Sequence, residues 1–188
     1  MRKTLTAALL AASLLTLAAC GNDTDTDPGA AHNEADVTFA QQMIPHHQQA
    51  VEMARLAQTR AGDREVQDLA ADIEAAQDPE IETMTGWLDS WGEEVAGSDM
   101  PGMDHGNMPM GEMHGMMSAE EMADLEAASG AEFDSMFLAM MVAHHEGAIE
   151  MAKTEQADGE YTDVIALAED IEKAQTAEIS TMNELLGS

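Results

Sequence analysis

Apolar residues recur along this chain with the spacing of amphipathic helices. In the first such segment the intervals alternate between four and three, which places the residues on one helical face. The positions are Phe39, Met43, His46, Ala50, Met53 and Ala57. Similar patterns, separated by polar breaks, predict four helices, near Ala35–Arg60, Arg64–Trp91, Ala119–Gln156 and Glu160–Leu186.

The second half of this pattern repeats the first at a constant offset of 98 residues. His46, for example, recurs as His144, and the agreement continues without a gap through two copies of one helical hairpin, residues 36–90 and 134–188. A hairpin cannot bury its apolar stripe alone, so we expect the two to close on each other in a single domain, residues 36–188. The predicted fold class is all-α, an antiparallel four-helix bundle built from two repeated helical hairpins.

Two places leave the helix boundaries open. Ser118 begins a capping-box pattern and predicts the start of the third helix, whereas residues 129–130 are either a second start or a weak point within it. Pro45 removes one backbone hydrogen bond, so the first helix either kinks beside His46 or begins at the proline. The apolar positions upstream of Pro45 favour the kink.

The first 19 residues have the pattern of a secretory signal. A cationic start precedes an apolar run that is shorter than the roughly 20 residues needed to span a bilayer. The run ends in Leu-Ala-Ala-Cys at Cys20, which resembles the lipobox of bacterial lipoproteins. That resemblance implies a lipid on Cys20, which would anchor the mature protein to the outer face of the cytoplasmic membrane. A plain signal peptide is the alternative. Residues 20–35 are polar and predict a flexible tether.

Composition narrows the function classes. The 37 Asp and Glu residues against 7 Lys and Arg give a net charge of −30, which excludes binding to nucleic acid by charge. Cys20 is the only cysteine, so neither an intramolecular disulfide nor a cysteine-based zinc site can form. The sequence contains no G-x-S-x-G, no H-E-x-x-H and no candidate cysteine nucleophile, so we expect no enzyme; a metal-dependent oxidase is the enzymatic alternative.

Paired histidines are the first candidate site. His46 lies on the apolar face of its helix and His47 at the edge of the core beside it, and the same pair recurs in the second copy. Glu80 and Glu178 interrupt the apolar stripe of the partner helices, where a carboxylate is costly unless it is paired or bound to a cation. Either a His–Glu network fixes helix register, or these side chains form an inward-facing metal site. The candidate ligands are His46, His47, Met43, Met53, His144, His145, Met141, Met151, Glu80 and Glu178.

A segment rich in Met and His lies between the two copies, within residues 95–118. Its Gly and Pro residues forbid a continuous helix, so its thioethers cannot form a core stripe. Thioether sulfur favours Cu(I) or Ag(I), and imidazole also accepts Cu(II); low-complexity filler is the alternative. The candidate ligands are Met100, Met103, His105, Met108, Met110, Met113, His114, Met116 and Met117. We expect this loop to capture Cu(I) weakly and the helical histidines to form the better-organised site.

The blocks MIPHHQQAVEMA and MVAHHEGAIEMA, each followed by an Ile-x3-Gln-x2-Glu-Ile-x2-Met string, resemble the domain of unknown function 305 family over Asp36 to Leu186. The resemblance implies a ferritin-like bundle, export from the cytoplasm, and an association with copper binding and tolerance. The Glu-x-x-His pattern of di-iron bundles is absent, which argues against iron oxidase chemistry.

The expected function is therefore an extracytoplasmic, membrane-anchored lipoprotein that binds copper for sequestration, tolerance or hand-over. Its expected partners are the metal ion and, through the lipid on Cys20, the membrane. A structural or protein-interaction bundle without metal is the alternative.

Overall fold

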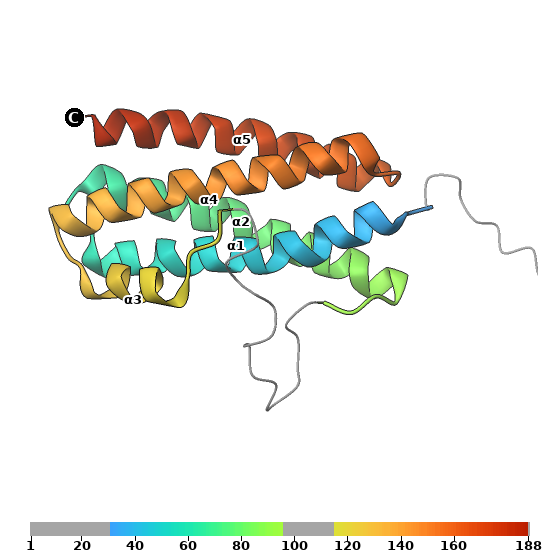
Figure 1. Cartoon of the computed structure of the whole chain (residues 1–188), viewed down its shortest axis with the longest axis horizontal. Helices are drawn as coiled ribbons and strands as arrows, with labels where there is room; N and C mark the ends of the chain where they lie inside the picture. Colours follow the sequence, from blue (N-terminus) through green and yellow to red (C-terminus); the bar gives the residue numbers. More distant parts are fainter. Residues whose placement is uncertain (1–30, 96–114, 188) are drawn as a thin grey trace, which may run out of the picture.

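The computed structural model describes residues 31–95 and 115–187, and this part of the chain is helical. α1 (Glu34–Arg60) and α2 (Arg64–Trp91) form one hairpin, and α4 (Ala131–Asp158) and α5 (Thr162–Leu186) form the other (Figure 1). A short helix, α3 (Ala119–Ala127), precedes the second hairpin. The predicted all-α bundle of two repeated hairpins is confirmed. Within the described residues, no helix combines the length and the apolar character needed to cross a membrane.

Helix α1 begins slightly earlier than the predicted tether boundary. Asn33 is its N-cap, because the Asn33 side chain accepts hydrogen bonds from the backbone N–H groups of Ala35 and Asp36. The Asp36 carboxylate accepts from the backbone N–H of Asn33 in return, which completes a capping box. The helix then runs through Pro45 to Arg60, so a start at the proline is excluded.

The prediction of one continuous helix over Ala119–Gln156 is wrong, because the chain breaks between α3 and α4. Gly130 has a φ of 63°, in the left-handed region that favours glycine, and its backbone N–H donates to Arg60 O at 2.8 Å. The break is therefore fixed against the turn of the first hairpin. The predicted capping box at Ser118 does begin α3, with Glu121 as its partner.

The core consists of two apolar clusters that the offset of 98 residues relates to each other. One cluster contains Met53, Phe137 and Met141, and the other contains Phe39 and Met43 together with helix α5 residues of the second copy. Between the clusters, α1 and α4 carry buried polar residues, which are His46, His47, Gln49, His144 and His145. The two hairpins meet through α1 and α4, with α2 packed on α1 and α5 packed on α4.

Each hairpin holds the turn of the other by one aspartate. Asp36 of α1 accepts hydrogen bonds from the backbone N–H groups of Glu160 and Tyr161 in the α4–α5 turn. Asp134 of α4 accepts from Gly62 and Asp63 in the α1–α2 turn, at 2.9 and 3.0 Å. The two hairpins are therefore joined reciprocally at both ends of the bundle, antiparallel along α1 and α4.

Candidate metal centre

The first histidines of the two pairs meet in the middle of the bundle. The rings of His46 on α1 and His144 on α4 have centroids 3.7 Å apart and are tilted by 38°. Both residues are fully buried, as expected from their place on the apolar faces. The meeting follows from the repeat, because equivalent positions on α1 and α4 face each other where these two helices pack together. We call this pair the inner histidines.

The second histidine of each pair is bonded to a carboxylate. His47 Nε2 lies 2.7 Å from Glu80 Oε2 on α2, and His145 Nε2 lies 2.6 Å from Glu178 Oε2 on α5. His47 was expected at the edge of the core and is instead fully buried, because α2 packs over that side of α1. Each glutamate thus pairs with the second histidine of its own hairpin.

Several ring nitrogens in this layer have no partner with hydrogen-bonding geometry among the described residues. They are Nδ1 of His47, Nδ1 of His145, and both ring nitrogens of His144. A carboxylate on one ring nitrogen orients the imidazole and raises the basicity of the other nitrogen, which is the arrangement found behind metal-bound histidines. The layer therefore contains buried ring nitrogens that are suited to act as ligands of a metal ion.

Two buried glutamines extend this polar layer. Gln77 on α2 and Gln175 on α5 are equivalent in the repeat, and each precedes its glutamate by three residues, on the same helical face. The Oε1 atoms of both side chains, and Nε2 of Gln77, lack partners in the described residues. The sequence shows these residues as interruptions of an apolar stripe, but we had not counted them in the site.

Burial favours the uncharged form of His144. The pKa of His144 lies well below its usual value, first because burial penalises the imidazolium and then because His46, His145 and His47 would repel it. A neutral imidazole is the form that coordinates a metal ion. Protons therefore compete with a metal at His144 only at a pH below the ordinary histidine range.

The methionines of the helices are distributed unevenly around this layer. Met43, Met53 and Met141 are fully buried, each in one of the two apolar clusters that flank the histidines. Met151 was expected to point inward but is only partly buried, and it lines an open groove between α1 and α4. The histidines, and not the thioethers, thus make the polar centre of the bundle.

Most of the Met/His-rich loop lies outside the described residues. This holds for Met100, Met103, His105, Met108, Met110, Met113 and His114, and for Cys20, the predicted site of lipidation. Met116 is partly buried and Met117 is 7% exposed, packed in the same cluster as Met53 and Met141. Within the described ranges, no three or more His, Asp or Glu side chains are grouped so as to hold a metal ion.

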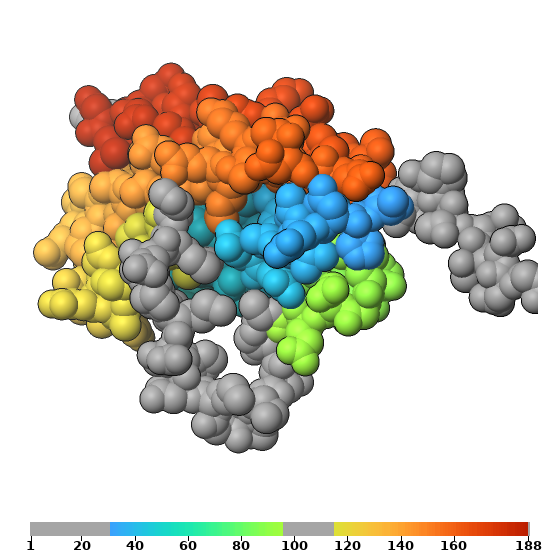
Figure 2. Space-filling view, turned by 45° about the vertical axis from the view of Figure 1, so that its right-hand side comes forward, coloured from blue at the N-terminus to red at the C-terminus, as the bar shows by residue number. Residues whose placement is uncertain are grey.

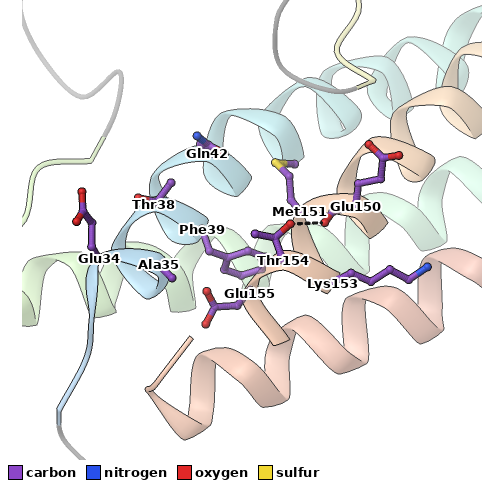
Figure 3. A pocket seen from close by; sticks show the side chains of 10 residues that line it. All are labelled: Glu34, Ala35, Thr38, Phe39, Gln42, Glu150, Met151, Lys153, Thr154 and Glu155. Atoms are coloured by element: carbon purple, nitrogen blue, oxygen red, sulfur yellow. Dashed lines mark hydrogen bonds between the residues drawn. The ribbon is translucent and has the colours of Figure 1, made fainter. Parts of the chain in front are cut away.

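The surface along which α1 and α4 meet is covered at one end of the bundle and open at the other. At one end α3, yellow in Figure 2, packs against it. Leu125 of α3 lies in one cluster with Leu56, Met136 and Met140. The equivalent residues at the other end are Thr154, Thr38 and Gln42, by the offset of 98. They line an open groove of about 760 Å³, with Phe39 and Met151 at its base (Figure 3).

A buried pair of carboxyl groups lies at the open end. Glu155 on α4 is 1% exposed, and its pKa is raised to about 8, first by burial and then by the neighbouring Asp36 carboxylate. Hydrogen bonds from Asn33, Tyr161 and Glu160 lower the pKa of Asp36 against the opposing effect of its burial. Glu155 is therefore protonated at neutral pH beside an ionised Asp36. The equivalent of Glu155 in the first copy is Ala57.

Comparison with known proteins places the chain among solved structures of the same fold. A family model described as domain of unknown function (DUF305) matches residues 36–186. A DUF305 protein from Streptomyces coelicolor, inferred to be secreted, is 36% identical with a TM-score of 0.72, over 81% of this chain and 92% of that chain. A DUF305 fragment from Deinococcus radiodurans is 31% identical with a TM-score of 0.71, over 82% and 97%.

A third similar protein, CopM, has been solved with metals bound. Its Cu(II)-bound form is 30% identical to this chain with a TM-score of 0.66, over 81% of this chain and 95% of that chain. CopM is also known in Cu(I)-bound, Ag-bound and apo forms. None of the curated proteins compared with the chain matches it.

Proposed function

The chain belongs to the DUF305 family, and from that premise we propose that it is an extracytoplasmic protein that binds copper at the buried histidines. The observation that carries the proposal is the contact of His46 with His144, with both ring nitrogens of His144 left without a hydrogen bond of good geometry. Two buried imidazoles in contact suit an ion that accepts few, soft or intermediate ligands. The copper- and silver-bound forms of the similar protein CopM support the same ion class.

The rest of the polar layer fits the proposed ion. Glu80 and Glu178 orient His47 and His145, the outer histidines, through Nε2, and Nδ1 of each of these two rings has no hydrogen-bond partner among the described residues. Because both carboxylates are already engaged with histidines, the layer does not resemble the carboxylate-rich centres of di-iron bundles. We therefore propose binding, sequestration or hand-over of copper, and no catalytic turnover.

The location and the anchor are part of the proposal. The Leu-Ala-Ala-Cys sequence at Cys20 supports lipidation and attachment to the outer face of a bacterial cytoplasmic membrane. The acyl chains would supply the membrane affinity that a chain of net charge −30 lacks. Changing Cys20 to Ala should release the protein into the soluble fraction; membrane association of that variant with the signal still cleaved would contradict the anchor.

The experiment that tests copper binding compares two variants in anaerobic Cu(I) titrations against a competing chelator. In one variant His46 and His144 are changed to Gln, and in the other the loop methionines are changed to Leu. We expect the histidine variant to lose the tighter site and the loop variant to keep it. Acid should weaken only the histidine site, because thioethers do not titrate. If neither variant loses copper, the proposal is wrong. The histidine layer would then be a structural network, in which the two His–Glu hydrogen bonds fix the register of the helices.

A further inference from the structure

The segment that leads into α3 crosses the α1–α4 interface at the level of the inner histidines. We call residues 115–118 the strap. Gln49 of α1 binds it through both atoms of its amide: Nε2 donates to Met117 O at 2.8 Å, and Oε1 accepts from the Met117 backbone N–H at 2.7 Å. Gln49 is 9% exposed, so these hydrogen bonds are largely shielded from water. The strap is therefore fixed to the helix that carries His46.

On the other side the strap lies against the backbone of α4. Gly115 has a φ of 80°, and a Cβ atom there would lie 3.1 Å from the Cα atoms of both His144 and Gly147 and still closer to the carbonyl oxygen of Ala143. A side chain at this position is thus excluded both by the backbone conformation and by the contact. The strap reaches the helical turn that carries His144.

The two contacts use one position of the repeat. Gln49 and Gly147 are equivalent by the offset of 98 residues, and each follows its inner histidine by three residues. On α1 this position carries an amide that reaches the strap, and on α4 it carries no side chain, which lets the strap approach. The departure from the repeat at this position thus accommodates the strap over the inner histidines.

All four imidazoles are fully buried, so neither an ion nor a reagent can reach them unless something moves. The outer ends of the polar layer are closed by Glu80 and Glu178, and the α1–α4 interface beside the inner pair is crossed by the strap. We propose that the strap is a releasable cover of the inner histidines, held closed by Gln49, through which copper enters and leaves. This inference rests on the proposed function and adds the route to the site.

The first test needs no metal. Diethyl pyrocarbonate acylates accessible, neutral imidazole, and mass spectrometry of peptides gives the rate for each histidine. In Gln49→Ala the strap loses two hydrogen bonds, so the open population and the acylation rate of His144 should rise about tenfold or more. Gly115→Ala displaces the strap by contact and should have the same effect. His32, outside the polar layer, is the internal reference whose rate stays constant.

The matched control for Gly115→Ala is Gly92→Ala. Gly92 has a φ of 76°, and a Cβ there would meet nothing within 4 Å, so this variant carries the same backbone strain without touching the strap. We expect wild-type acylation rates at His144 in this control. If His144 reacts equally slowly in wild type, Gln49→Ala and Gly115→Ala, the strap is not the cover, whether or not the protein binds copper.

The second test measures Cu(I) exchange. A cover that does not touch the ion changes its entry and its release by the same factor, so both rate constants for Cu(I) should rise about tenfold in Gln49→Ala while the dissociation constant stays unchanged. A weaker dissociation constant with an unchanged entry rate would overturn the proposal, because the strap would then be a ligand. Faster acylation and exchange in Glu80→Gln, with no change in Gln49→Ala, would also overturn it. Copper would then enter past the His–Glu pairs, His47–Glu80 and His145–Glu178. Absence of Cu(I) binding in wild type would refute the proposed function and leave the acylation result to decide on the cover.

Discussion

The two hairpins present the same side chains in the middle of the bundle and different ones along the outer face of α1 and α4. In the middle, His46 meets His144, and the bonds from His47 to Glu80 and from His145 to Glu178 differ in length by 0.1 Å. Along the outer face, α3 covers one end and leaves a groove at the other. The repeat is thus retained in the buried layer of histidines and glutamates. It is modified along the outer face, where α3 packs on one end only.

The largest difference between the two ends should appear in the pH dependence of stability. Glu155 has a pKa of about 8 in the folded protein against 4.5 as the ordinary value, so the folded state holds this proton more tightly. The free energy of unfolding should fall by about 1.4 kcal/mol per pH unit as pH rises from 4.5 towards 8. Chemical denaturation across that pH range measures the slope. Asp36 does not interfere, because its lowered pKa affects stability only at more acidic pH.

Two variants of Glu155 isolate this effect. Glu155→Gln keeps the shape of the side chain and should remove the slope, and Glu155→Ala copies Ala57 at the other end and should remove it as well. The reverse change, Ala57→Glu, places a carboxyl group at a fully buried position and should introduce the same slope there. A Glu155→Gln profile identical to wild type would show that this pair does not control the pH dependence.

The next largest effect should be on the free energy of unfolding, through the packing of α3 on one end of the bundle. Leu125 is fully buried against the residues of the covered end, so Leu125→Ala should cost about 3 kcal/mol of unfolding free energy. Met151→Ala in the open groove is the control and should cost less, because that side chain is only partly buried. Similar losses in the two variants, measured by urea denaturation, would mean that α3 contributes no more than the open end does.

The central similarity is tested by the two glutamates. Glu80→Gln and Glu178→Gln each remove the charge behind a histidine, and each should weaken Cu(I) affinity by about 10- to 100-fold. The repeat predicts equal losses. A loss confined to one variant would show that the proposed copper site uses only one hairpin.

The smallest effect concerns the exposed ion pairs that the copies also share. Arg55 bonds Glu74 at 2.8 Å, and the equivalent Lys153 lies 3.4 Å from Glu172. The basic side chains are 60% and 59% exposed, so Arg55→Ala and Lys153→Ala should each cost less than about 1 kcal/mol, and less still in high salt. A cost above that value, unaffected by salt, would indicate packing of the side-chain stem.

Periodicity and the internal repeat were sufficient for the fold and for the buried histidines. Helical spacing placed His46 on a core face, and the offset of 98 implied that His144 occupies the equivalent place. Which carboxylate meets which histidine was not predictable in this way, because it depends on the relative rotation of α1 and α2. The helix break at Gly130 was not predictable for a similar reason, because it is fixed by a hydrogen bond to the carbonyl oxygen of Arg60, which is distant in sequence.

Two of the residues that sequence reasoning missed lie at positions where the two copies disagree. In the alignment of the two copies, Gln49 corresponds to Gly147, and Glu155 corresponds to Ala57. A search for agreement finds the shared core, whereas these mismatches mark the strap and the carboxyl pair. The role of Gln49 comes from its contact with the segment between the copies, whereas that of Glu155 comes from its burial beside Asp36 of the other hairpin.

The contact of His46 with His144 lies where a symmetry axis would pass if the hairpins were two identical chains. A residue beside the axis of a homodimer meets its own copy, so one substitution that introduced a histidine there would have supplied two imidazoles at once. Duplication and fusion of such a hairpin would keep that pair while freeing each half to diverge. The reciprocal bonds of Asp36 and Asp134 have the form of an isologous interface, as expected of a protein descended from a two-subunit ancestor.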